Sequence, residues 1–132
     1  MALIFKHFPL ESIHIHARPL AELAACAAEQ DQFWPVHDFL FEPSTVLSMI
    51  SAEYLASRLP LSVEALRVCA ADAGRTAVDA DVSQAAELGV SSTPQFVMGV
   101  MHSTGVDVRY RIRGAASATV FRGVLEELAR SR

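Results

Sequence analysis

The sequence has 132 residues, enough for one domain with its own core; 52% of them are hydrophobic, and the formal net charge is −4. The acidic balance argues against a nucleic acid as the main partner, and no run of about 18 uninterrupted apolar residues indicates a transmembrane helix. Residues 1–10, MALIFKHFPL, lack the basic start and the cleavage site of a signal peptide, so we expect a cytoplasmic chain without a membrane partner.

The N-terminal part of the sequence predicts one short strand followed by helices. Residues 2–8, ALIFKHF, form an apolar run that Pro9 ends, which is typical of a strand. Residues 18–30 are rich in alanine and leucine and carry a proline near their start, which favours a helix. Residues 31–42 repeat apolar side chains at helical spacing, so we expect a second helix there.

Serine and glycine residues mark the expected ends of the next helices. Ser51 and Ser62 are predicted N-caps of helices over residues 52–59 and 63–72. Gly74 is expected to break the second of these helices, because glycine disfavours a helix interior.

The C-terminal third predicts another helix and then a hairpin. Residues 77–88 continue the helical pattern up to Gly89, a residue type that often ends helices. Residues 94–100 and 108–114 are predicted strands, with Gly105 in the tight turn between them. Strand, helices, two strands and a final helix in this order indicate an α/β fold.

The last helix is expected over residues 118–132, with Ser117 as its N-cap. Its apolar stripe is predicted to consist of Val120, Val124, Leu125 and Leu128. The strand before it carries alternating arginines, which we interpret as a solvent-exposed face rather than a phosphate-binding patch: Arg109, Arg111 and Arg113.

Several short motifs together are similar to one known family. In chain order they are a strand ending in HFPL, an H-x-H-A turn, an alanine-rich helix with a central cysteine, FW-x-x-HD-x-LF, and LGV-x-x-TP-x-F before a hairpin. This series resembles the DsbA-like branch of the thioredoxin superfamily, whose members are thiol-disulfide oxidoreductases, often periplasmic or secreted. The resemblance implies an incomplete thioredoxin-like α/β fold, with a single domain over residues 1–132 and a helical insertion at about 18–75.

The resemblance also implies a site for substrate. In that family a cis-proline lies beside the redox centre, and Pro94, with Thr93 before it, matches that position. A cis bond there would present the backbone to an extended polypeptide or a thiol substrate. The family's C-x-x-C dithiol precedes the segment that matches residues 2–8, and this sequence contains no C-x-x-C. We therefore name no catalytic residue and expect no cofactor, and we expect an inactive or incomplete oxidoreductase.

The two cysteines, Cys26 and Cys69, have two interpretations. Buried free cysteines in a cytosolic chain are ordinarily inert, and this is the default. The resemblance offers the alternative of a structural disulfide within the helical insertion, as in some members of the family. A redox-active role is not expected, because both residues lie well inside predicted helices rather than at a helix N-terminus.

Histidines and a tryptophan invite functional readings that we weigh against simpler ones. His14 and His16 are a weak metal signal without a third ligand nearby, so we expect a structural role and no metal site. Trp34 is interpreted as a core aromatic residue, and His37 and Asp38 as packing and helix-capping residues.

The absent dithiol segment leaves a pairing problem for residues 2–8. In the thioredoxin fold the missing strand lies between them and the strand at Pro94, and unpaired buried backbone groups are costly. We expect direct pairing of the two segments, a homodimer through an unpaired strand edge, or a chain that is a fragment of a longer product. Two alternative functions stay open: a non-catalytic binding or dimerisation module that uses the Pro94 edge, and a glutathione-dependent activity of the related kappa-type branch.

Overall fold

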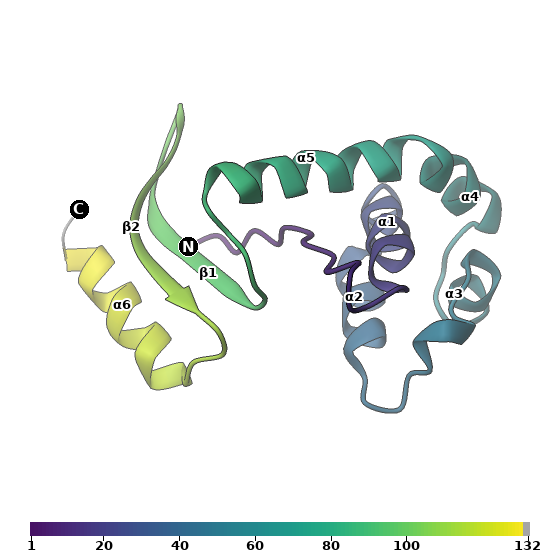
Figure 1. The fold of residues 1–132 in the computed structure, drawn as a ribbon, viewed down its shortest axis with the longest axis horizontal. Coiled ribbons are helices and arrows are strands. Elements are labelled where there is room, and N and C mark those ends of the chain that lie inside the picture. Colours follow the sequence, from purple (N-terminus) through teal and green to yellow (C-terminus); the bar gives the residue numbers. More distant parts are fainter. Residues whose placement is uncertain (131–132) are drawn as a thin grey trace. The chain divides into compact units, whose positions relative to one another are not determined.

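The structure, a computed structural model, describes residues 1–130 and divides into two compact units (Figure 1). Unit 1 is Met1–Gly89, and unit 2 begins at Val90. The main hydrophobic cluster draws only on unit 1, and the single domain expected over residues 1–132 stays a prediction. The arrangement is mixed α/β, and the thioredoxin-like class stays a prediction.

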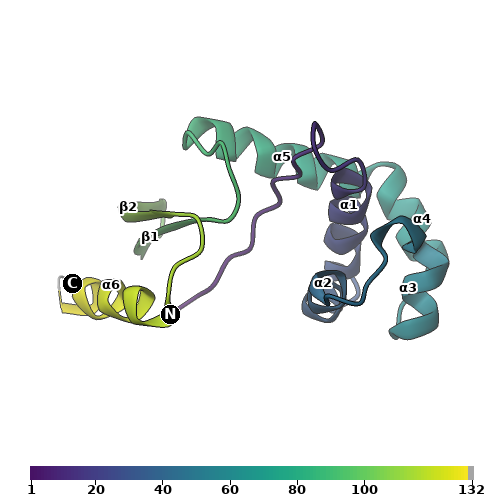
Figure 2. The same cartoon turned by 60° about the horizontal axis from the view of Figure 1, so that its bottom comes forward.

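Unit 1 is helical. Its elements are α1 (Ala17–Ala28), α2 (Phe33–Phe41), the short 3-10 helix η1 (Leu47–Met49), α3 (Ala52–Arg58), α4 (Val63–Ala71) and α5 (Ala73–Glu87). Helix α1 is central, because it contacts α2, α4 and α5 (Figure 2). The helical part therefore extends beyond the insertion expected at about 18–75. Among residues 1–130, no helix is both long enough and apolar enough to cross a membrane.

Side-chain caps start the helices where the sequence predicts them. The Ser51 hydroxyl accepts a hydrogen bond from the Tyr54 N–H at 3.2 Å, and the Ser62 hydroxyl accepts one from the Ala65 N–H at 3.2 Å. Such caps satisfy backbone donors that a helix start leaves free. Both predicted N-caps are confirmed.

Gly74 does not break a helix, contrary to the prediction. The break lies at Asp72, whose backbone has φ −142° and ψ −73°, and α5 already includes Gly74. A Cβ at Gly74 would lie 2.5 Å from Cys26 Sγ and 3.0 Å from the Glu22 carbonyl oxygen. Glycine is needed here because α5 passes too close to α1 for any side chain.

Residues 2–8 form no strand, so that prediction is wrong. They run as extended chain without a ladder, and Leu3, Ile4 and Phe5 keep 74%, 57% and 37% of their surface exposed. A strand needs a neighbour for its backbone groups, and the only sheet in the described part of the chain consists of two later strands.

Unit 2 is a hairpin followed by a helix. Strands β1 (Gln95–His102) and β2 (Gly105–Arg113) pair antiparallel around a turn of Ser103 and Thr104. Both strands reach further into the turn than expected, and Gly105 has φ +145°, a conformation that suits glycine. The register shifts next to Gly99, where a Cβ would lie 2.0 Å from the Asp107 carbonyl oxygen.

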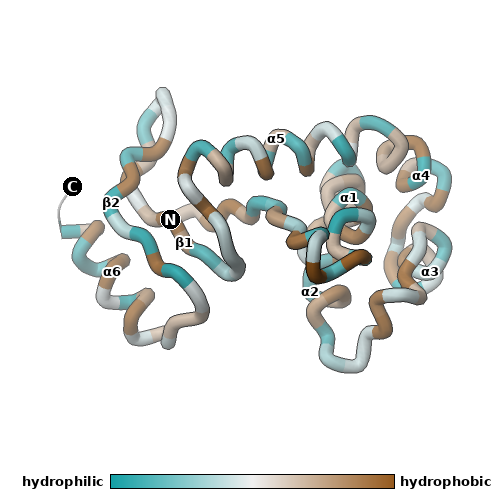
Figure 3. The backbone as a smooth tube through the Cα atoms, viewed as in Figure 1, coloured by the Kyte–Doolittle hydropathy of each residue, from teal (hydrophilic) through white to brown (hydrophobic). Residues whose placement is uncertain are grey.

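Helix α6 (Ala118–Arg130) packs on one face of the hairpin, and hydrophobic and hydrophilic residues alternate along it (Figure 3). Phe96 of β1 contacts Phe121 at 4.7 Å between ring centroids. The buried side of α6 therefore includes Phe121 and Leu128, whereas Val120 is 47% exposed. The predicted stripe is wrong at Val120 and at Leu125, which is 36% exposed, and it omitted Phe121, the residue that contacts the sheet.

Candidate functional site

Unit 1 contains a shallow pocket of about 400 Å³ beside the extended N-terminal segment. Apolar and aromatic side chains make up most of its wall, together with one imidazole and one carboxylate. The lining residues are Leu3, Ile4, Phe5, His7, Ala25, Ala28, Phe33, Trp34, Ala77 and Asp81. Binding sites in proteins commonly combine an apolar wall with few polar groups in this way.

Phe5 is the centre of the aromatic wall. Its ring lies 5.3 Å from Phe33, 5.3 Å from His7 and 5.0 Å from His37, measured between centroids. The contacts with the two histidines are edge-to-face, with interplanar angles of 73° and 78°. Aromatic pairs in this geometry contribute about 0.5–1.5 kcal/mol beyond area burial. The N-terminal segment is thus attached to α2 by edge-to-face and tilted ring contacts.

Asp81 of α5 attaches the same segment through charge. Its carboxylate accepts hydrogen bonds from Lys6 Nζ and from the His7 backbone N–H, each at 2.9 Å. The bond from the His7 N–H takes over part of the role that a neighbouring strand would have, since it satisfies a backbone donor of an extended segment.

His7 is the one buried polar residue among the described positions. Burial lowers the pKa of its imidazole below the ordinary value of 6.5, and the Asp81 carboxylate partly opposes that change. The ring is therefore held in its neutral form near pH 7, among Phe5 and Phe33.

The other aromatic predictions have mixed outcomes. Trp34 is 44% exposed and lines the pocket, so its interpretation as a core residue is wrong. His37 Nδ1 lies 2.9 Å from Asp38 Oδ1, and its ring packs against Phe41 at 4.8 Å. The packing role expected for His37 is confirmed, whereas Asp38 caps no helix end.

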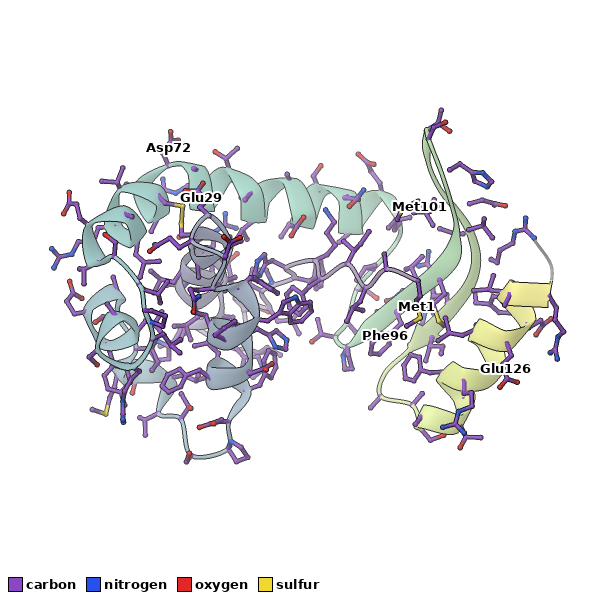
Figure 4. All side chains as sticks on the ribbon, turned by 180° about the vertical axis from the view of Figure 1, so that it is seen from behind. Met1, Glu29, Asp72, Phe96, Met101 and Glu126 are labelled. Carbon is purple, nitrogen blue, oxygen red and sulfur yellow. A yellow bond between two sulfur atoms is a disulfide. The ribbon has the colours of Figure 1, made fainter. Side chains whose placement is uncertain are left out.

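Cys26 of α1 and Cys69 of α4 form a disulfide, with their Cα atoms 5.7 Å apart. Figure 4 shows this bond in yellow near Glu29 and Asp72. The structure therefore contains the disulfide that the resemblance implied, and not the inert free cysteines expected by default. His14 and His16 precede α1, and residues 1–130 contain no group of three His, Cys, Asp or Glu side chains arranged for a metal ion.

Thr93 and Pro94 stand at the start of β1 in unit 2, and the bond between them is cis. Both residues are exposed, and the Pro94 carbonyl accepts a hydrogen bond from the Gly114 N–H at 2.8 Å. Their role in holding a substrate stays a prediction.

The sequence reasoning missed the pocket. Phe5, Phe33 and Asp81 come from three separate segments, and Asp81 lies 74 positions from the residue whose N–H it accepts. The available signal was the spacing of Phe5 and His7, which places both side chains on one face of an extended segment.

Two curated proteins are similar to this chain. Over 96 residues it is 38% identical to a protein of Salinispora tropica named Na(+)/H(+) antiporter NhaA 3, and the match covers 70% of the chain and 14% of that protein. Over 117 residues it is 32% identical to Na(+)/H(+) antiporter NhaA 1 of Salinispora arenicola, covering 87% of the chain and 18% of that protein. The chain thus spans less than a fifth of the length of the curated relatives it matches.

No family model matches the chain, and no solved structure matches it. The relatives are named as antiporters, which are membrane transporters, and neither name mentions thiol–disulfide exchange. The predicted membership of the DsbA-like family is therefore wrong, and so is the oxidoreductase function inferred from it. Short motifs shared over a chain of this length misled the assignment.

Proposed function

We propose that this chain is a module of an Na+/H+ antiporter that does not itself carry the ions. The observation that carries the proposal is the 38% identity over 96 residues to the antiporter of Salinispora tropica. The matched stretch is 14% of that protein, so the chain corresponds to one part of a much longer transporter.

The charged residues of unit 1 support a structural rather than an ion-carrying role. Arg18 of α1 contacts Glu11 at 3.6 Å and Glu22 at 3.0 Å, and it also pairs with Asp79 of α5. A carboxylate that carries Na+ or H+ must exchange its partner during transport, and such groups line an ion pathway. The carboxylates around Arg18 instead share one permanent cation.

Asp81 is similarly committed. It is the least exposed of the ion-paired carboxylates, with 14% of its side chain accessible, and it holds the N-terminal segment through Lys6 and the His7 N–H. Binding an ion at Asp81 would release that segment from α5. We therefore assign Asp81 to folding of the module.

The proposal is tested in the full-length Salinispora tropica antiporter, reconstituted in vesicles with a pH-sensitive dye inside. A variant that lacks the stretch matched by this chain is expected to exchange Na+ for H+ with a half-saturating Na+ concentration within about twofold of the intact protein. An ionophore added at the end calibrates the dye, and protease protection verifies that the variant is inserted. Loss of exchange in a correctly inserted variant would show that the ions use this segment.

A further inference from the structure

The outer edge of β1 in unit 2 carries backbone groups that β2 does not use. The Gly114 N–H donates to the Pro94 carbonyl, which makes these two residues a hydrogen-bonded pair of the ladder. Bonded and non-bonded pairs alternate in an antiparallel ladder, so Gln95 and Val97 belong to non-bonded pairs. Their N–H and C=O groups therefore point away from β2. No hydrogen bond from another described residue reaches them.

The two edges of this hairpin are not equivalent. Strand β2 carries recurring charged residues, and the register shift leaves Arg109 without an opposite residue on β1. Both features keep a strand edge from pairing with a further strand. Along β1, residues 95–101 read QFVMGVM and carry no charge. The edge of β1 is therefore the one that is open to another strand.

Two side-chain donors lie on one face of the hairpin at the start of this edge, Gln95 on β1 and Arg113 opposite it on β2. Gln95 and Arg113 are directly opposite each other and so share a face of the sheet, the face away from α6. The Gln95 Nε2 atom is buried and lacks an acceptor among residues 1–130, which ordinarily costs about 1–3 kcal/mol. The Arg113 side chain is exposed, and it forms no ion pair with another residue among residues 1–130. An amide and a guanidinium side by side match one carboxylate.

The next position on the same face has a different character. Val97 lies directly opposite Arg111, so an aliphatic side chain follows the donor pair at a spacing of two residues. A strand added beside β1 would complement these side chains if it had an acidic residue next to Gln95 and an aliphatic residue next to Val97. These two residues would stand two positions apart in the added strand.

We propose that the edge of β1 binds an extended segment of another polypeptide, as a third strand, in which an acidic and an aliphatic residue stand two positions apart. Charge decides between this occupant and a second copy of the chain, since residues 95–101 of a copy would bring no carboxylate to Gln95 and Arg113. The inference rests on unit 2 alone and is independent of the antiport proposal.

The probe is a fluorescent eight-residue peptide of serine and threonine with Glu and Val two positions apart, added to the full 132-residue chain. We expect saturable fluorescence anisotropy with a dissociation constant of about 1–100 µM. In the unaltered chain, the amide hydrogen exchange of Gln95 and Val97 is expected to slow about tenfold at saturation. Neither readout requires a variant to fold.

Variants test the geometry. Val97→Pro removes an outward N–H from β1, and Val106→Pro is its matched control because the pair Met101–Val106 is also non-bonded and Val106 faces away from β1. We expect Val97→Pro to weaken peptide binding about tenfold or more and Val106→Pro to change it less than about threefold. Arg113→Gln is expected to weaken binding of the Glu peptide but not of a peptide with Gln in its place.

Three results would overturn the inference. One is the absence of binding up to about 1 mM peptide, which corresponds to negligible affinity. Another is an equal effect of Val97→Pro and Val106→Pro. The third is a dimer in light scattering that Val97→Pro dissociates, because a second copy would then occupy the edge.

Discussion

Reduction of the Cys26–Cys69 disulfide is expected to lower the free energy of unfolding of unit 1 by about 4 kcal/mol. The bond joins α1 to α4 across a sequence separation of 43, and the chain-entropy relation gives about 4 kcal/mol for a loop of that length. Cys26 is 1% exposed and Cys69 7%, so a reductant reaches the bond only after unfolding. The effect is therefore measured on chain that is unfolded, reduced and refolded.

Urea unfolding followed by circular dichroism measures the difference between the oxidised and the reduced chain. With a slope of about 2 kcal/mol per molar urea, the midpoint is expected to fall by about 2 M on reduction. A double variant, Cys26→Ala with Cys69→Ala, is the control, and its midpoint should not respond to reductant.

Thiol titration in denaturant without reductant decides the underlying premise. The disulfide predicts no free thiol. Two reactive thiols would restore the alternative of inert buried cysteines, and a midpoint that reduction leaves unchanged would show that the disulfide does not stabilise unit 1.

Three further predictions concern single residues. Asp81→Asn removes the ionic partner of Lys6, so the free energy of unfolding of unit 1 should fall by about 1–2 kcal/mol and the His7 amide should exchange faster with deuterium. An unchanged exchange rate would contradict the role of Asp81 in holding the N-terminal segment. Because burial lowers the pKa of His7, the unfolded state takes up a proton more readily than the folded state. The contribution of neutral His7 to the free energy of unfolding is therefore complete above pH 6.5 and is lost as the pH falls below 6.5 through the lowered pKa. An NMR titration midpoint at or above 6.5 would be inconsistent with burial. Gly99→Ala places a Cβ 2.0 Å from the Asp107 carbonyl oxygen and should destabilise the hairpin by about 1–3 kcal/mol or more. Its control is Gly123→Ala, which has no atom within 4 Å of the added Cβ and should stabilise α6 by about 0.5–1 kcal/mol. Equal effects of the two variants on stability would count against the close approach at Gly99.

Local signals in the sequence predicted the local structure well. Serine N-caps at Ser51 and Ser62 begin helices, and Gly89, with φ +67°, follows the end of α5. The hairpin and its glycine turn also lie close to their predicted positions. These features depend on interactions between residues a few positions apart, which a single sequence records directly.

Features that depend on distant contacts were not predictable in the same way. The apolar run 2–8 has the composition of a strand, but its partner is the Asp81 carboxylate on a helix rather than another strand. Gly74 is a helix breaker by propensity, yet the close approach of Cys26 makes it the residue that fits inside α5. In both cases tertiary contacts override local preference.

Family motifs had the same weakness for function. The motifs around Trp34 and Pro94 resembled an oxidoreductase family, whereas identity over 96 and 117 residues connects the chain with proteins named as antiporters. Function depends on the site and on the protein to which a module belongs, and short motifs report neither.

We propose above that this chain is a module of an antiporter and does not carry its ions. The most direct measurement exchanges the matched stretch of the Salinispora tropica antiporter for the corresponding stretch of this chain and titrates Na+ against proton release in vesicles. We expect exchange with a half-saturating Na+ concentration within about twofold of the natural protein. Abolished exchange, or a shift of about tenfold or more, in a correctly inserted chimera would contradict it.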